Sequence, residues 1–313
     1  MYRIGIDLGG TNIVAGLVDE NLKIVDTRSI KTDAPRSVQS IVDDMARLAY
    51  TLMEQNHLTA ADVASVGVGV PGTANPQNGH LEDANNLGFE DVPLLPLLAQ
   101  KLPVPVHFDN DANVAALGEY LAGGYGEDSF VMVTLGTGIG GGIILGGKLW
   151  SGINGAAAEF GHMTVDMHGV SCNCGRRGCF EALASANALI AQAQEAMASQ
   201  PESLLWKLCG GDMQKVEAKT VFDGAAAEDP VSRKVLDTYL TYLAEGITNI
   251  INIFQPAVLC IGGGVSHAGD ALLLPLRERV KKSIYSKNAK INTRIELAKL
   301  HNDAGVLGAA LLG

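Results

Sequence analysis

Two short glycine-rich segments carry residue types that could bind phosphate. Glycine lets backbone N–H groups approach an anion closely, and threonine and asparagine add side-chain donors. An aspartate at the start of the first segment could hold Mg²⁺, directly or through water. The residues concerned are Asp7, Gly9, Gly10, Thr11 and Asn12 in the first segment and Gly136, Thr137 and Gly138 in the second. The two loops could grip the β- and γ-phosphates of ATP, although either loop alone could be a tight hairpin turn.

Two common nucleotide motifs do not explain these loops. Gly136, Gly138 and Gly141 satisfy the spacing G-x-G-x-x-G, but a dinucleotide fingerprint needs a helix after its glycines. The residues that follow are IILGGKLW, which predict a strand. A Walker A loop needs the triplet G-K-[ST], and neither loop contains one. Mg²⁺, backbone dipoles and hydroxyl groups must therefore neutralise the phosphates.

A third glycine cluster follows the apolar run AVLCI. It comprises Gly262, Gly263 and Gly264 and lies between a predicted strand and a predicted helix. Such a junction would let a flat group such as adenosine approach the backbone closely. A simple turn that leads into the helix would explain the glycines equally well.

Three cysteines and two histidines could form a metal site. Cys172, Cys174 and Cys179 follow His162 and His168, and three thiolates with one imidazole would complete a tetrahedral Zn²⁺ site. Four protein ligands leave no open position, so this zinc would be structural. Spacing alone does not decide between the two histidines, and three free thiols are the alternative. Of the other cysteines, Cys260 is expected in the core, and Cys209 has no identified partner.

Composition limits the classes of function. The chain has 313 residues, 47% hydrophobic and 18% charged, with a net charge of −11. This length predicts two globular domains, and the acidic balance argues against nucleic-acid binding and favours a neutral small-molecule substrate. The first residues lack the pattern of a signal peptide, and the glycine-rich run 130–147 predicts two strands rather than a membrane helix. We therefore expect a cytoplasmic protein without a membrane partner.

The elements that position these residues follow an α/β pattern. Residues 1–31 predict a meander of strands, 37–57 a helix, VASVGVGVPG and PVPVHFDND two strands, and ANVAALGEYLAG a helix. Near Phe130 the strand–turn–strand pattern begins again. Helices are then expected over ASANALIAQAQEAMAS, over VSRKVLDTYLTYLAEGITNIINIF and over ALLLPLRERVKKSIY, with the strand AVLCIGGG between the last two. The small-residue segment AGVLGAALLG predicts a last helix that could pack closely on another element.

These motifs together resemble the ROK family of sugar kinases and related repressors over essentially the whole chain. The resemblance rests on IGIDLGGTN, GVGVPG, FDNDANVAALGE, VTLGTGIGGGII, AAAEFGHM, CNCGRRGCFE and LCIGGGV. It implies an actin-like, hexokinase-type (ribonuclease H-like) α/β fold with two domains and an interdomain cleft. Residues 1–120 would form the smaller N-terminal domain, to which a helix at about 300–313 returns. Residues 121–299 would form the larger domain, which carries the zinc-binding loop.

The resemblance also assigns roles to residues. Asp111 would be the catalytic base; the alternative is that it caps the following helix. The sugar would be bound by Gly72, Asn86, Asn110, Asp111, Glu159, His162 and Glu181. Zinc would be bound by His162, Cys172, Cys174 and Cys179, so the resemblance selects His162 over His168 and gives it both zinc and sugar. Glu159 and Glu181 could otherwise be solvated acids. The chain departs from the family pattern at Phe89, where many members have tryptophan, and this puts that sugar contact in doubt.

The activity implied is ATP-dependent phosphorylation of a hexose 6-hydroxyl, with glucose the expected substrate. The rivals are a kinase for N-acetylglucosamine, mannose, fructose or allose, and a non-catalytic sugar sensor. Repressors of the family carry a helix-turn-helix before the first phosphate loop, whereas Asp7 lies six residues from the start of this sequence. A DNA-reading role is therefore not expected. Relatives are commonly homodimers, so a homodimer is expected.

Overall fold

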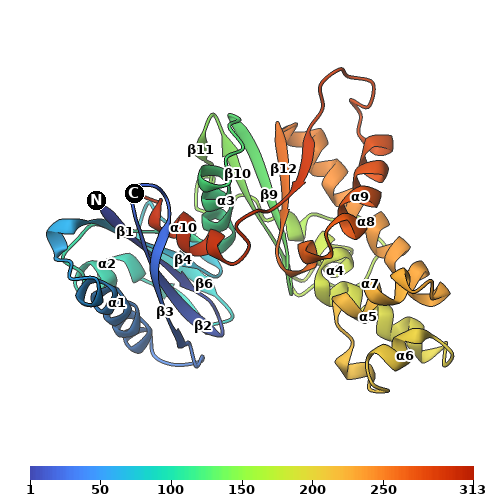
Figure 1. Cartoon of the computed structure of the whole chain (residues 1–313), viewed down its shortest axis with the longest axis horizontal. Helices are drawn as coiled ribbons and strands as arrows, with labels where there is room; N and C mark the ends of the chain where they lie inside the picture. The colour runs from blue at the N-terminus through green and yellow to red at the C-terminus, as the bar shows by residue number, and fades with distance from the viewer. The chain divides into compact units, whose positions relative to one another are not determined.

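The polypeptide forms two units in the structure, a computed structural model that describes residues 1–313 (Figure 1). Unit 1 comprises residues 1–128, 142–158 and 299–313, and unit 2 comprises residues 129–141 and 159–298. Each unit contains sheet strands and packed helices. The expected domain limits, 1–120 and 121–299, stay a prediction. No helix combines the length and the apolar character needed to cross a bilayer.

The main sheet of unit 1 has the strand order β3-β2-β1-β4-β8. The strands are β1 (Tyr2–Leu8), β2 (Asn12–Val18), β3 (Ile24–Lys31), β4 (Val63–Val70) and β8 (Val106–Asn110). The first three form the expected antiparallel meander, and β4 and β8 continue the sheet in parallel with β1. β1 and β4 are apolar on both faces because helices cover both.

Helices cover the two faces of this sheet differently. α1 (Val38–Gln55) covers one face, where its buried residues, which include Ile41 and Met45, share a hydrophobic core with Ile4 and Ile6 of β1. Successive strand residues point to opposite faces, so Gly5 faces the other side, where α10 (Asp303–Ala310) lies. A Cβ at Gly5 would come within 1.9 Å of a backbone oxygen of α10. Only glycine permits this close approach.

The last helix packs equally closely on α3 (Asp111–Ala122). A Cβ at Gly308 would lie 1.7 Å from the carbonyl oxygen of Val114, and one at Gly118 would lie 2.3 Å from that of Ala304. The small residues of AGVLGAALLG are therefore needed where two backbones meet, as the sequence predicts.

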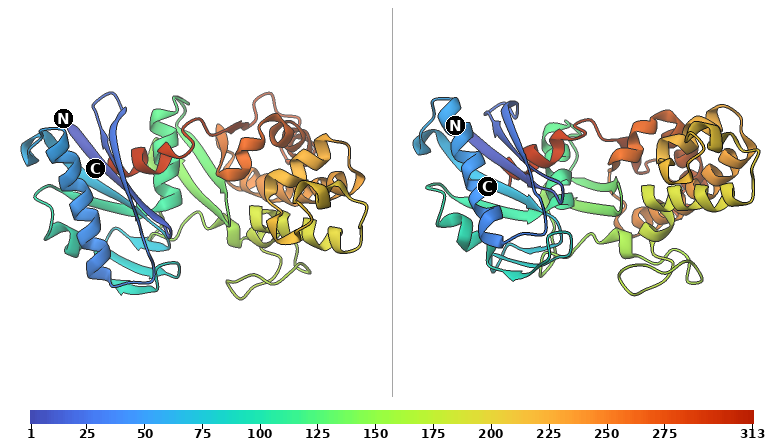
Figure 2. Two further views of the ribbon diagram at one scale, coloured as in Figure 1. Left: turned by 60° about the horizontal axis from the view of Figure 1, so that its bottom comes forward. Right: turned by 90° about the horizontal axis from the view of Figure 1, so that it is seen from below.

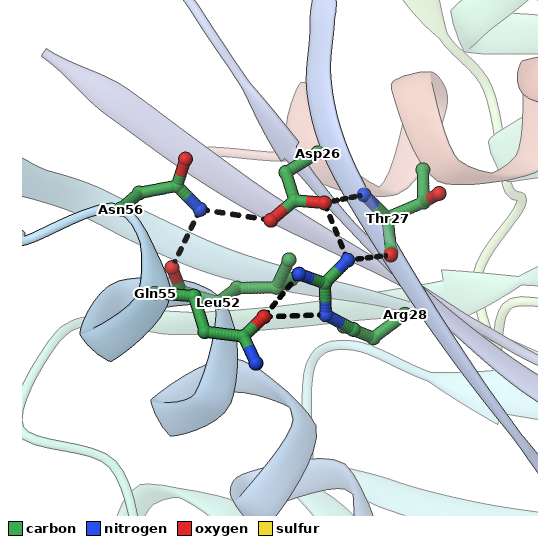
Figure 3. Close-up of polar contacts among 6 residues, drawn as sticks. All are labelled: Asp26, Thr27, Arg28, Leu52, Gln55 and Asn56. Carbon is green, nitrogen blue, oxygen red and sulfur yellow. Dashed lines mark hydrogen bonds and ion pairs between the residues drawn. The ribbon is translucent and has the colours of Figure 1, made fainter.

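Side chains of the edge strand β3 form hydrogen bonds with residues at the end of α1 (Figure 3). Arg28 Nε donates to Gln55 Oε1 at 2.6 Å, and Asn56 Nδ2 donates to Asp26 Oδ2 at 3.0 Å. Asp26 also accepts from Arg28 at 2.5 Å. These side chains connect β3 to the end of α1, and charged groups at an edge strand oppose pairing with another chain.

A small second sheet of unit 1 is not expected from the sequence. It has the order β5-β6-β7, with β5 (Thr73–Asn75), β6 (His80–Ala84) and β7 (Phe89–Val92), and is followed by α2 (Leu94–Ala99). These strands are only three to five residues long, so no alternation of apolar residues could reveal them.

Unit 2 combines parallel strands with a set of helices (Figure 2). The strands are β9 (Ser129–Leu135), β12 (Val258–Gly262) and β13 (Arg294–Leu297), with β12 in the middle. The helices are α4 (Phe180–Ala184), α5 (Ala186–Ala198), α6 (Leu204–Leu208), α7 (Ala218–Ala226), α8 (Pro230–Phe254) and α9 (Asp270–Ser283). Cys260 is fully buried in β12, as expected.

The strand after the second glycine loop is shorter than predicted. β10 (Ile139–Leu145) begins in unit 2 and ends in unit 1, where it pairs with β11 (Lys148–Leu149). The prediction of one strand through IILGGKLW is wrong, because Gly146 and Gly147 have φ values of 58° and 73° and form a hairpin turn. The conclusion that no helix follows the loop is confirmed.

Candidate active site

The first glycine loop is the turn between β1 and β2, and Thr32 holds it in place. Gly9 N–H donates to Asn12 O at 2.9 Å within the loop. Buried Thr32 donates its N–H to Thr11 O at 2.9 Å and its Oγ1 hydrogen to Gly9 O at 2.6 Å. The C=O and N–H of one trans peptide point in opposite directions, so the Gly10 N–H turns away from Thr32. Sequence reasoning missed Thr32, which lies outside any motif.

Asp7 lies at the end of β1 in surroundings that fit a cation. Burial raises the pKa of its carboxyl, and no hydrogen bond or ion pair within the protein offsets this effect. Its Oδ2 is 2.8 Å from the position of a Cβ at Gly305, so the carboxylate lies against the start of α10. An ionised carboxylate there would gain from a nearby Mg²⁺, which prefers such an oxygen ligand.

The first loop lies beside an expected sugar ligand. A Cβ at Gly10 would be 3.6 Å from Asn86 Cβ, in the exposed turn between β6 and β7. Phe89, at the departure from the family pattern, is only 6% exposed and packs in the core of unit 1. Its ring is therefore a side chain of the core.

Asn110, rather than Asp111, caps α3. Asn110 Oδ1 accepts from Ala112 N at 2.9 Å and from Asn113 N at 3.2 Å, while its Nδ2 donates to Gly72 O at 2.9 Å. The alternative that Asp111 is the N-cap residue is therefore wrong, although its Oδ1 also accepts from Ala112 N at 2.8 Å. Asp111 is the first residue of α3, and its carboxylate is exposed at the positive end of the helix.

A buried acid, Asp109, which the sequence analysis missed, precedes Asn110 and Asp111 and holds the start of α3 through hydrogen bonds. Asp109 is 4% exposed, and its Oδ1 accepts from Asn110 N at 2.7 Å and from Asn113 Nδ2 at 2.9 Å. Its Oδ2 accepts from Ser151 Oγ at 2.9 Å. Burial raises the pKa of Asp109, and these hydrogen bonds oppose the rise. Asp109 lies within the segment FDNDANVAALGE, but its role depends on contacts with Asn113 and Ser151 that its type and spacing do not indicate.

The second glycine loop, between β9 and β10, is held by residues of unit 2. Gly136 N donates to Gly138 O at 3.0 Å, and Ala186 N donates to Gly136 O at 2.9 Å. Glu181 Oε2 accepts from Ile139 N at 2.8 Å. Glu181 is therefore not simply a solvated acid.

His162 and Glu181 lie close enough to Glu159 to affect the pKa of its carboxyl. Partial burial raises the pKa of Glu159, while His162 opposes the rise and Glu181 adds to it. Glu159 immediately precedes a short 3₁₀ helix, Phe160–His162, which positions the imidazole. Three of the residues expected to bind sugar therefore lie near one another in unit 2, although they come from two separate segments of the sequence.

The third glycine cluster forms the turn after β12. Gly263 has a φ of 80°, and a Cβ there would lie 2.5 Å from Leu135 O. Gly264 begins a 3₁₀ helix, Gly264–Ala268, and a Cβ there would meet nothing within 4 Å. Gly263 is thus required by the fold itself, whereas Gly264 leaves open space in which a ligand could approach the backbone.

The cysteine–histidine cluster has the geometry of a metal site. The ligand atoms of His162, Cys172, Cys174 and Cys179 all lie within 4.8 Å of one another. Cys174 Sγ is 3.6 Å from Cys179 Sγ, and Cys172 Sγ is 3.8 Å from His162 Nδ1. Zn–S bonds of about 2.3 Å arranged tetrahedrally give such separations. His168 lies outside the group and is exposed.

The surrounding loop fixes these ligands. Arg176 donates to His162 O at 2.9 Å and to Thr164 Oγ1 at 2.8 Å. Burial raises the pKa of the Cys179 thiol to about 12, so the thiolate would need a cation beside it. Because Nδ1 of His162 faces the cysteines, Nε2 is the nitrogen left for another ligand.

Comparison with known proteins agrees with the motifs. The family model described as "ROK family" matches residues 3–313. The chain belongs to the ROK family. A glucokinase from Thermotoga maritima is 38% identical over 310 residues, covering 98% of this chain and 95% of that protein. An N-acetylmannosamine kinase from Shigella boydii is 33% identical over 312 residues, covering 100% and 98%.

A solved structure supports the fold of this ROK family chain. A ROK family glucokinase from Streptomyces griseus, in complex with glucose and AMPPNP, has a TM-score of 0.85 and 35% identity. The match covers 100% of this chain and 99% of that one. The expected actin-like, hexokinase-type α/β fold is confirmed.

Proposed function

We propose that this ROK family protein is a glucokinase, which transfers the γ-phosphoryl group of ATP to the 6-hydroxyl of glucose. One observation carries the proposal: in each unit a glycine loop lies against an expected sugar ligand. Gly10 lies beside Asn86 in unit 1, and Ile139 donates to Glu181 in unit 2. The glucokinase from Thermotoga maritima and the glucose- and AMPPNP-bound relative support the same reaction.

The chemistry needs a base at the sugar hydroxyl. Asp111 accepts the proton of the 6-hydroxyl as the hydroxyl oxygen bonds to the γ-phosphorus, and the bond to the β–γ bridging oxygen breaks to release ADP. Asn110 fixes the start of α3 through its cap and its bond to Gly72. Positioning of this kind supplies much of the catalysis in phosphoryl transfer.

Two metal ions are part of the proposal. Asp7 would hold Mg²⁺, which when bound neutralises charge on the phosphates. His162, Cys172, Cys174 and Cys179 would hold a structural Zn²⁺ with no open coordination position. We also propose that residues 1–120 and 121–299 act as two domains, that Gly262, Gly263 and Gly264 approach the adenosine of ATP, and that the chain is a homodimer.

A coupled ADP-release assay across a sugar panel tests the function. The panel contains glucose, mannose, fructose, allose, N-acetylglucosamine and N-acetylmannosamine. We expect glucose to have the highest kcat/KM. A higher value for another sugar would reassign the substrate, and ADP release with none of them, from zinc-loaded protein, would favour the sugar sensor. One pocket contact changes selectivity by only about 1–3 kcal/mol, so the panel is needed.

A further inference from the structure

Glu181 contacts the second glycine loop as well as the expected sugar subsite. It lies on α4, two residues after Cys179. Its Oε2 accepts the Ile139 N–H at 2.8 Å, directly after the loop Gly136–Gly138. A sugar ligand would not need this bond.

The backbone around Glu181 is shaped to admit its carboxylate. A Cβ at Gly138 would lie 2.3 Å from Glu181 Oε2, and one at Gly161 would lie 3.3 Å from Glu181 Cβ. Any side chain at Gly138 would therefore displace the carboxylate. Glycine at this position serves the acid as well as an approaching phosphate.

The bonds of the loop determine which way its amides point. Gly136 O accepts from Ala186 N, so the Thr137 N–H of the same peptide points away from α5. Gly138 O accepts from Gly136 N, and Glu181 accepts the Ile139 N–H on the other side of the same peptide. Both sides of the loop are thus fixed by α4 and α5 before any phosphate arrives, which preorganises its donors.

We propose that Glu181 is a positioning residue of the phosphate loop: Oε2 fixes the loop through Ile139, while Oε1 remains for a sugar hydroxyl. The inference rests on the proposed function, because it takes the loop to bind the phosphates of ATP. One carboxylate then serves both substrates within unit 2.

Nucleotide binding without sugar separates this role from sugar binding. We would measure the affinity of Mg·AMPPNP for the wild type, Glu181→Gln and Glu181→Ala by calorimetry with no sugar present. Glutamine keeps an oxygen acceptor for Ile139, and alanine does not. Both variants remove the same negative charge near the phosphates. The ratio of their affinities for Mg·AMPPNP therefore reports the effect of the hydrogen bond to Ile139 alone. We expect alanine to bind Mg·AMPPNP roughly fivefold more weakly than glutamine.

The outcomes are distinct. Equal affinities of the two variants, within about twofold, would overturn the positioning role and leave the kinase proposal standing. A clear difference without phosphorylation of any sugar would support the role and overturn the proposed reaction. A wild type that binds no Mg·AMPPNP would overturn both. Glu195→Ala on α5 is the matched control, because it removes an exposed acid of unit 2 and should leave the affinity unchanged. Thermal unfolding and zinc content of each variant check that α4 is intact.

Discussion

Asp111 is the residue on which the proposed chemistry depends most directly. Asn110 occupies the N-cap position of α3, and asparagine at position 111 would keep an oxygen for the Ala112 N–H, which Asp111 Oδ1 also accepts at 2.8 Å. Asp111→Asn should therefore fold normally and bind sugar, yet lose at least about 100-fold in kcat, as is typical when a general base is removed.

Steady-state kinetics and a separate measurement of glucose affinity check this prediction. A kcat within about tenfold of the wild type, with glucose binding intact, would show that another group accepts the proton. Asn110→Asp is a useful comparison, because it retains an oxygen that can cap α3 but loses the bond to Gly72.

The raised pKa of Asp109 predicts that the free energy of unfolding depends on pH. Burial raises its pKa above the ordinary 3.8, so the folded state holds this proton more tightly than the unfolded state. This contribution to stability is complete below pH 3.8 and is lost as the pH rises through the raised pKa. We compare the free energy of unfolding of the wild type with that of Asp109→Asn at each pH. The difference should decrease as the pH rises from 3.8 through the raised pKa of Asp109, and it should stay constant at higher pH.

Denaturant unfolding from about pH 2 to pH 8 would measure this difference and that of the control. Asp43 offers a control of opposite sign, because its hydrogen bond with Lys101 lowers its pKa. Relative to Asp43→Asn, the wild type should lose stability only as the pH falls below 3.8. A flat difference for Asp109→Asn would show that its hydrogen bonds cancel the effect of burial.

The sequence indicates most residues of the candidate site but not the residues that hold them in place. The glycine loops, Asp111 and the cysteine ligands belong to compact motifs, so their types and spacing were informative. Thr32 and Asp109 act through tertiary contacts, and a buried threonine has no sequence pattern that separates it from any other. The second role of Glu181 likewise appears only when α4 is placed beside β10.

At the scale of elements, α10 shows how strongly close packing constrains sequence. Its Gly308 meets Val114 O at a distance that no Cβ could occupy. Gly308→Ala should separate α10 from α3 and lower the free energy of unfolding by about 3 kcal/mol, since overpacking forces backbone shifts. Chemical denaturation measures this loss.

Gly264→Ala is the matched control for this substitution. A Cβ there would meet nothing within 4 Å, and the residue does not require a left-handed backbone conformation. We expect a change of less than about 1 kcal/mol. Equal effects of the two substitutions would contradict a steric origin.

The longer elements were predictable and the short ones were not. α1 and α8 carry apolar residues at helical spacing over 18 and 25 residues, so their existence followed from periodicity. The strands β5, β6 and β7 have too few residues for a period to appear. Their positions depend on tertiary contacts within unit 1.

At the scale of the whole molecule, the metal cluster belongs to unit 2 alone. Removing zinc with a chelator should therefore increase hydrogen exchange in residues 159–185 and leave peptides of unit 1 unchanged. Hydrogen exchange with mass spectrometry measures this, and metal analysis should give about one zinc per chain.

Two cysteine variants sharpen this test. Cys174→Ser should lose zinc and reproduce the effect of the chelator, whereas Cys209→Ser, outside the cluster, should keep its zinc. Less than half an equivalent of zinc, after growth with zinc, would reject the metal assignment. Loss of protection throughout both units would show that the ion supports more than its own loop.

The placement of α10 has a consequence for biosynthesis. The helix is made after all of unit 2, yet it covers one face of the sheet to which the first strand, β1, belongs. At typical translation rates, roughly ten to forty seconds pass between α3 and α10. Throughout that interval the groove at Gly5 and Gly67 has no helix to fill it. Most of unit 1 therefore emerges from the ribosome before unit 2, but unit 1 completes its fold last.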